Sequence, residues 1–127
     1  SGSSGDAKPV VRTLASKLAG AATRARALGL RAGEGCLIGV PLTSAQGVTM
    51  MLTAMWLGGA LGLLAPVDHR QALAALALPD FAFWWATPYF ADVLGRVALT
   101  RPPVAPRLCV TSSPIAREVF ERFVLRY

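Results

Sequence analysis

Short apolar runs alternate along this chain with longer segments whose apolar residues recur at helical spacing. The apolar runs predict strands near residues 36–40, 61–65, 81–86 and 107–111. The segments with helical spacing predict helices near residues 10–28, 48–57, 69–77, 88–97 and 115–126. Alternation of this kind is typical of right-handed βαβ crossovers. We therefore predict an α/β fold, a mainly parallel sheet with helices on both faces. It would form one subdomain over residues 1–127, with a loop at 1–9 and the alternating elements at 10–127.

The first and last of these helices are predicted to be amphipathic. In the first, apolar residues recur at intervals of three and four, and Gly29 takes the C-terminal capping position. These residues are Val10, Leu14, Leu18, Ala22 and Ala25. The apolar face of the last helix is formed by Ile115, Val119, Phe120, Phe123 and Val124. Its opposite face spaces two pairs for i,i+4 ion pairing, Arg117 with Glu121 and Glu118 with Arg122.

Polar residues predict where the inner helices begin. Thr43 or Ser44 is a candidate N-cap for the second helix. Asp68, with Gln71 three residues later, resembles a capping box for the third. His69, the only histidine of the sequence, would then lie in an exposed first turn. We expect a surface role for it rather than a catalytic one.

Residues 47–67 carry no charge, and this stretch of 21 residues is long enough for a membrane-spanning helix. The spacing of Gly58 and Gly62 would be a helix-packing motif in such a span. However, Gly58-Gly59 interrupts the stretch and Pro66 ends it. The stretch divides better into a buried helix, a glycine turn and a buried strand. We therefore expect a soluble α/β protein without a membrane span.

Composition places most of the 127 residues in a core, because 54% are apolar and the mean hydropathy is +0.47. Such apolarity would be natural for a piece of a larger enzyme, and it predicts self-association of the isolated chain through exposed apolar surface. The net charge of +6 raises the possibility of nucleic-acid binding. The basic residues are scattered rather than interleaved with aromatics, so we expect a solvated surface and no nucleic-acid partner. The aromatic run at 81–86 is expected to be core.

The two cysteines, Cys36 and Cys109, fall inside apolar runs. They are expected to be small buried hydrophobes in a reducing compartment, and therefore in a cytoplasmic protein, rather than a disulfide. One histidine and no cysteine cluster argue against a structural zinc site. The polar start of the sequence lacks the order of charges and apolar residues of a signal peptide.

The first eight residues of the sequence combine glycines, hydroxyls and one lysine. Backbone N–H groups of a glycine-rich loop can form a concave nest for an anion, and a lysine adds a positive charge for phosphate. The loop is not a Walker loop, because GxxxxGK followed by Ser or Thr is absent. A flexible linker or an expression-tag remnant is the alternative for these residues. The candidate phosphate ligands are Ser1, Gly2, Ser3, Ser4, Gly5 and Lys8.

This octet resembles the phosphate-binding loop of the adenylate-forming enzymes, which include acyl-CoA synthetases, acyl-AMP ligases, luciferases and peptide-synthetase adenylation domains. In that family a Ser/Thr- and Gly-rich run ends in Pro-Lys, whereas Ala7 replaces the proline here. The family loop leads into a helix that ends in LGLxxGD, and Leu28 to Glu34 reads LGLRAGE. A tag remnant would have no reason to precede that pattern in register.

Two further segments resemble the same family. The turn at 41–47 is similar to the family's PxxHxxG, which contributes to the acyl-substrate pocket, although Ser44 stands in the place of the histidine. The resemblance implies that Ser44, Gln46 and Gly47 line that pocket. The alternative, that Thr43 or Ser44 is simply the N-cap of the next helix, is equally well supported, and the two interpretations do not exclude each other. The chain from 107 to 127 is similar to the strand, small-residue turn and helix that precede the family's YGxTE motif. The resemblance places Ser112, Ser113 and Pro114 beside the adenine.

The resemblance implies that the parent enzyme activates a carboxylic acid with ATP and Mg²⁺ to an acyl-adenylate, with CoA or an acyl carrier protein as a possible acceptor. No catalytic residue is assigned within this chain, because the glutamate of YGxTE and the lysine of the C-terminal domain fall outside it. We therefore expect a fragment that is inactive by itself. The alternative is a stand-alone α/β interaction module whose apolar excess is a partner interface.

Overall fold

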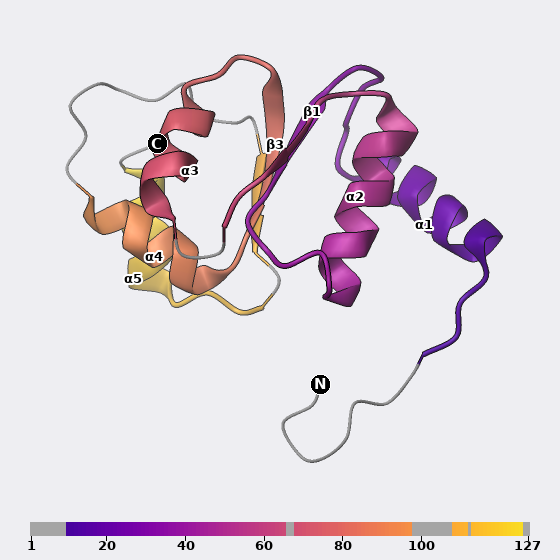
Figure 1. The fold of residues 1–127 in the computed structure, drawn as a ribbon. Helices are drawn as coiled ribbons and strands as arrows, with labels where there is room; N and C mark the ends of the chain where they lie inside the picture. Colours follow the sequence, from indigo (N-terminus) through magenta and orange to yellow (C-terminus); the bar gives the residue numbers. More distant parts are fainter. Residues whose placement is uncertain (1–9, 66–67, 98–107, 112, 126–127) are drawn as a thin grey trace.

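The computed structural model describes residues 10–65, 68–97, 108–111 and 113–125 (Figure 1). In chain order the elements alternate between helix and strand. They are α1 (Leu14–Ala27), β1 (Gly35–Ile38), α2 (Ala45–Leu57), β2 (Leu61–Leu63), α3 (His69–Leu76), β3 (Phe81–Ala86), α4 (Pro88–Arg96), β4 (Leu108–Thr111) and α5 (Arg117–Val124). The predicted α/β class is confirmed.

The four strands form one parallel sheet in the order β2-β1-β3-β4. In β1, Cys36 pairs with Leu61 of β2 on one side and Phe83 of β3 on the other. Gly35 allows this close pairing, because a Cβ there would lie 3.2 Å from the carbonyl oxygen of Ala60 and would collide with the carbonyl oxygen of Asp80. The carboxyl ends of all four strands therefore face one edge of the sheet.

Helices cover both faces of the sheet, as predicted. Figure 1 shows α1 and α2 on one side and α3, α4 and α5 on the other. Successive residues of β1 point to opposite sides: Cys36 and Ile38 pack with Met50 of α2, whereas Leu37 belongs to the core beneath Trp84 and α4. This arrangement explains why β1 is uniformly apolar, since a strand covered on both faces has no solvent side.

The aromatic residues of β3 lie in the core, as their apolar context predicted. Trp84 is fully buried and contacts two phenylalanines from different helices. Its ring centroid lies 5.6 Å from that of Phe90 in α4 and 5.6 Å from that of Phe123 in α5. Such tilted and edge-on pairs add to the burial of apolar area. Trp84 thereby ties the last two helices to the sheet.

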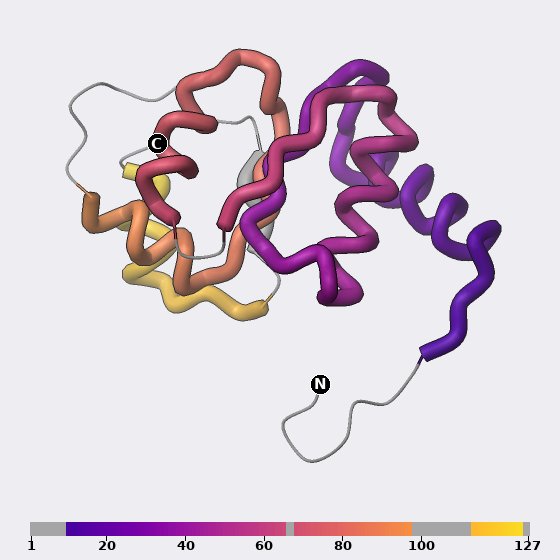
Figure 2. The backbone as a smooth tube through the Cα atoms, in the orientation of Figure 1, coloured from indigo at the N-terminus to yellow at the C-terminus, as the bar shows by residue number. Residues whose placement is uncertain are grey.

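The uncharged stretch at 47–67 is not one helix. The helix α2 ends at Leu57, and Gly58 follows in the left-handed region with φ of 66°. The backbone then returns through β2, a reversal that can be followed in Figure 2. Among the described residues, no helix is both long enough and apolar enough to cross a membrane. The predicted division into helix, glycine turn and strand is confirmed, but the strand is not buried as predicted: β2 lies at the edge of the sheet, and Leu61 and Leu63 are exposed.

Both amphipathic helices begin later than predicted. α1 starts at Leu14 because the hydroxyl of Thr13 accepts a hydrogen bond from the N–H of Ser16 at 3.1 Å. Gly29 follows α1 with a φ of 62°, which is the expected conformation for a residue that closes a helix. α5 starts at Arg117 and buries Phe123, but Phe120 and Val124 of its predicted apolar face are exposed.

One predicted ion pair and the predicted exposure of His69 need correction. Arg117 pairs with Glu121 at 2.7 Å, as expected for i,i+4 spacing. Arg122 was predicted to pair with Glu118, but it reaches Asp92 of α4 instead, at 2.7 Å. His69 does open α3, yet it is half-buried rather than exposed. The ion-pair partner of Arg122 and the burial of His69 both depend on tertiary packing, which the local sequence does not show.

Candidate functional site

The turns that follow β1 and precede α5 lie at the carboxyl edge of the sheet. In open α/β sheets this edge is where ligands bind, in the crevice beyond the strand ends. The segment at 41–47 leaves β1, and Ser113 and Pro114 come soon after the end of β4, with β3 between the two strands. The two predicted site segments therefore share one edge of the sheet. The octet at 1–8 and Ser112 lie outside the described residues.

Ser44 is held within the turn that it caps. Its hydroxyl donates a hydrogen bond to the carbonyl oxygen of Pro41 at 2.7 Å and accepts one from the N–H of Gly47 at 2.9 Å. The N-cap interpretation is thus confirmed for Ser44 rather than for Thr43. Because both hydrogen bonds are internal, the main task of the Ser44 side chain is to fix the backbone at the start of α2.

Gly47 is required by the same turn. It is buried, and a Cβ at this position would lie 2.8 Å from the Cα of Leu42 and would collide with the carbonyl oxygen of Pro41. The backbone of 41–42 therefore packs directly on the first turn of α2. Gln46 is exposed beside it, as are Ser113 and Pro114. Of the predicted site residues that the structure describes, these three have side chains accessible to a ligand.

Two buried indole groups at this end of β3 were not anticipated from the sequence. The Nε1 atoms of Trp84 and Trp85 are buried, with no hydrogen-bond acceptor among the described residues. The Nε1 of Trp84 lies against Gly39, where a Cβ would be only 3.3 Å away from it. Buried N–H groups usually donate a hydrogen bond, so these two indole N–H groups are exceptional polar groups inside an otherwise apolar region. The apolar pattern of 81–86 gave no signal for them.

Burial also affects two charged or reactive groups. It raises the pKa of the Cys36 thiol to about 12, so the predicted role as a buried hydrophobe is confirmed for this cysteine. It lowers the pKa of the Arg24 guanidinium. In the described ranges, no group of three or more His, Cys, Asp or Glu residues could hold a metal ion.

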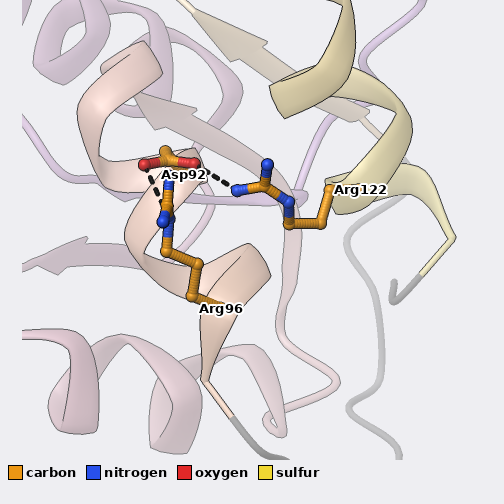
Figure 3. Close-up of polar contacts among 3 residues, drawn as sticks. All are labelled: Asp92, Arg96 and Arg122. Atoms are coloured by element: carbon orange, nitrogen blue, oxygen red, sulfur yellow. Dashed lines mark hydrogen bonds and ion pairs between the residues drawn. The ribbon is translucent and has the colours of Figure 1, made fainter.

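A separate cluster of charges links two helices on the opposite side of the sheet. Asp92 of α4 accepts hydrogen bonds from Arg96 at 3.0 Å and from Arg122 of α5 at 2.7 Å (Figure 3). All three side chains are partly exposed. One carboxylate is shared by two guanidinium groups, and the pair with Arg122 joins α5 to α4.

A cleft of about 590 Å³ runs between α1 and the start of α2, and we call it the α1–α2 cleft. Arg12, Lys17 and Arg24 line it. A second, more apolar hollow of about 400 Å³ lies at the other ends of the same helices and includes Trp56. The sequence signal for the first cleft was the recurrence of basic residues away from the apolar face of the first helix.

Comparisons with known proteins give one informative result. No protein-family model matches the sequence, and no curated protein matches it significantly. Among solved structures, the fold is similar to the inhibitor-bound N-terminal domain of FACL13 from Mycobacterium tuberculosis, with a TM-score of 0.74 and 15% sequence identity. The alignment covers 86% of this chain and 28% of that chain. FACL13 is a fatty acyl-CoA ligase of the adenylate-forming family. At 15% identity the likeness establishes the fold of this chain alone.

Proposed function

We propose that this chain is part of an AMP-forming ligase that activates a carboxylic acid with ATP to an acyl-adenylate. The observation that carries the proposal is the agreement of two independent signals. The order of elements superposes on the N-terminal domain of a fatty acyl-CoA ligase over 86% of the chain. The same stretch contains, in order, an octet, a turn at 41–47 and an ending that resemble that family. At 15% identity the fold match does not come from overall sequence similarity.

In this proposal the octet binds the β- and γ-phosphates of ATP. Its backbone N–H groups and the hydroxyls of Ser1, Ser3 and Ser4 would donate hydrogen bonds, and Lys8 would supply the positive charge. Stabilising charge on transferring phosphoryl groups is the chief catalytic task in such reactions. Mg²⁺ would be held by the YGxTE glutamate of the parent enzyme.

The carboxyl edge of the sheet would hold the other two parts of the acyl-adenylate. Ser112, Ser113 and Pro114 would border the adenine. Ser44, Gln46 and Gly47 would line the acyl pocket, and the geometry divides their tasks. Gln46 is exposed and would contact the acid directly, whereas Ser44 and Gly47 would shape the pocket through the backbone that they hold in place.

The chain spans 28% of the FACL13 chain that it matches, so catalysis is proposed for the parent protein alone. The isolated 127 residues should bind ATP weakly and form no adenylate. The octet offers a few charge-assisted hydrogen bonds of roughly 1.5–3 kcal/mol each. Ordering a terminal segment costs about 1–2 kcal/mol per residue, which offsets most of that gain. The parent reaction consumes ATP, and the buried free thiol of Cys36 suits a reducing compartment, so we propose a cytoplasmic enzyme.

The test is carboxylate-dependent exchange of radiolabelled pyrophosphate into ATP by the protein at its full natural length. A panel of short, medium and long carboxylic acids is supplied with Mg²⁺, and exchange is expected with at least one of them. Lys8→Ala should slow exchange by at least about tenfold, the loss of one charge-assisted contact to the transition state. Arg70→Ala, which removes an exposed positive charge from α3, is the matched control and should leave exchange unchanged.

A second candidate function is a stand-alone interaction module, and the distribution of exposed apolar side chains favours it. Trp56, Leu63, Tyr89 and Leu125 are large apolar side chains that are each at least half exposed, and a partner could cover them. Full-length protein that shows no exchange with any acid, and that forms a stable complex through one of these side chains, would favour this function over the ligase.

A further inference from the structure

The α1–α2 cleft lies between two helices and takes most of its polar wall from one of them. Ser16, Gly20 and Arg24 are spaced at intervals of four along α1, so they lie on one face of the helix. Lys17 stands seven residues before Arg24 and lines the same cleft, and Arg12 lines it from just before the helix. The opposite wall includes Thr49 from the first turns of α2.

Three cations line this cleft without a counter-charge. None of the described residues that line it is acidic. Between described residues, the ion pairs lie on α4 and α5 and involve Arg96, Arg117 and Arg122. Charged groups that lose solvent are normally paired with an opposite charge. An anion from outside would supply the missing charge in the cleft.

Arg24 is the cation whose position is best defined. Its Nη1 donates a hydrogen bond to the hydroxyl of Thr53 at 3.3 Å, and that hydroxyl in turn donates to the carbonyl oxygen of Thr49 at 2.9 Å. Thr53 is buried, so the guanidinium is anchored to the body of α2. The side chain is half-buried, and desolvation by burial lowers the pKa of Arg24.

Gly20 keeps the space between these cations open. Glycine inside a helix costs roughly 0.5–1 kcal/mol relative to alanine. No packing contact explains this glycine, because a Cβ at Gly20 would meet nothing within 4 Å. Its backbone is helical and does not require φ above zero. The absent side chain leaves room in the cleft, directly between Lys17 and Arg24 on the helix face.

We propose that the α1–α2 cleft is a binding site for a phosphorylated small molecule with two or more negative charges. The planar guanidinium groups of two arginines can each bind two phosphate oxygens, and the lysine adds a third positive charge. The hydroxyls of Ser16 on the α1 wall and Thr49 on the α2 wall add hydrogen-bonding capacity. The cations of this site are not among the residues proposed to hold ATP, but Ser44, which is proposed to line the acyl pocket, also lines this cleft.

The shape of the site favours a small molecule over a macromolecular surface. Its volume of about 590 Å³ lies within the range of roughly 300–1,000 Å³ that is usual for small-molecule pockets. The cations line one wall of a hollow whose other wall is formed by α2. Basic residues that bind a membrane or a nucleic acid instead form an open stripe on the surface. Vesicles with anionic headgroups therefore serve as the comparison in the test.

The experiment maps arginine reactivity in the protein at its full natural length. Arginines are modified with phenylglyoxal, with inorganic pyrophosphate present or absent at matched ionic strength, and modification at each residue is measured by peptide mass spectrometry. Pyrophosphate should slow modification of Arg12 and Arg24 several-fold. Arg117, whose side chain is 86% exposed and which lies on α5, is the internal control and should be unaffected.

Four variants locate the protection. Gly20→Glu places a carboxylate among the cations and should abolish protection, whereas Gly20→Gln, of the same size and uncharged, should retain most of it. Lys8→Ala should leave protection unchanged, which separates this cleft from the octet. Lys17→Gln should weaken pyrophosphate binding by about tenfold, the change expected on losing one charge-assisted contact.

Three outcomes would overturn the proposal. Arg24 could react at the same rate with and without pyrophosphate. Protection could be equal at Arg117, which would indicate ionic screening alone. Protection could also arise only with vesicles containing anionic lipid, which would assign the basic residues to a membrane surface.

Discussion

Gly47→Ala is the substitution for which the structure makes the sharpest prediction. Gly47 lies in the first turn of α2, where its N–H donates to the hydroxyl of Ser44. An added methyl group would lie 2.8 Å from the Cα of Leu42 and would collide with the carbonyl oxygen of Pro41. These contacts are with backbone atoms, which cannot move aside as the end of a flexible side chain can. The turn at 41–44 or the start of α2 must therefore shift.

The expected loss of stability follows from two opposing effects. Overpacking of a tightly packed site costs typically about 1–3 kcal/mol, and a clash with backbone places Gly47→Ala at the upper end. Replacing glycine by alanine inside a helix stabilises the helix by about 1 kcal/mol. The net change should be a loss of about 2 kcal/mol in the free energy of unfolding. For the proposed ligase, the same shift should also weaken binding of the carboxylic acid at the turn.

This change is measured by urea unfolding of the full-length protein, monitored by tryptophan fluorescence, to which the buried Trp84 contributes. Gly20→Ala is the matched control, because it makes the same chemical change in a helix where a Cβ meets open space. It should raise stability by up to about 1 kcal/mol. If Gly47→Ala is as stable as the natural protein, or is shifted in the same direction as Gly20→Ala, the close packing inferred at residues 41–47 is wrong.

Three further predictions concern stability. Burial raises the pKa of Cys36 from 9.0 to about 12, so the folded state holds the thiol proton more tightly than the unfolded state does. The free energy of unfolding should therefore fall as pH rises above about 9, by up to ~1.4 kcal/mol per pH unit. Urea unfolding of Cys36→Ala over the same pH range should lack this slope. Asp92→Asn should cost about 1 kcal/mol, because it weakens two partly exposed ion pairs. If the double variant Arg122→Gln/Asp92→Asn is as stable as the single variant Asp92→Asn, then Arg122 acts through Asp92. Thr87→Ala should lower the melting temperature, because it removes the cap of α4 at a cost of about 1 kcal/mol, while Thr87→Ser should not.

Much of the fold could be predicted because short apolar runs have few alternatives. The strand at Phe81–Ala86 has the predicted bounds, since Pro79-Asp80 precedes it and Thr87-Pro88 can only begin a helix. Gly58 ended α2 where expected, because its left-handed backbone is costly for other residues. The ends of α1 and α5 were less well predicted. Their apolar periodicity continues past the residues that have packing partners.

The candidate site was predicted less completely, for reasons that lie outside local sequence. Ser44 was recognised both as a cap and as a pocket residue, but only the hydrogen bonds to Pro41 and Gly47 show how it is held. Arg122 found a partner 30 residues away in Asp92, which i,i+4 spacing cannot reveal. The α1–α2 cleft likewise depends on how α2 packs against Arg24. The octet at 1–8 lies outside the described residues and stays a prediction.

The most direct test of the proposed reaction follows oxygen atoms from the acid to the nucleotide. The full-length protein is given ATP, Mg²⁺, an acyl acceptor and a carboxylic acid labelled with oxygen-18 in both carboxyl positions, and the products are analysed by mass spectrometry. Attack of the carboxylate on the α-phosphorus would leave one labelled oxygen on AMP after the acyl group is transferred. We expect AMP and pyrophosphate, with a single oxygen-18 atom in each AMP formed. Unlabelled AMP, or ADP and phosphate as the products, would contradict an acyl-adenylate intermediate.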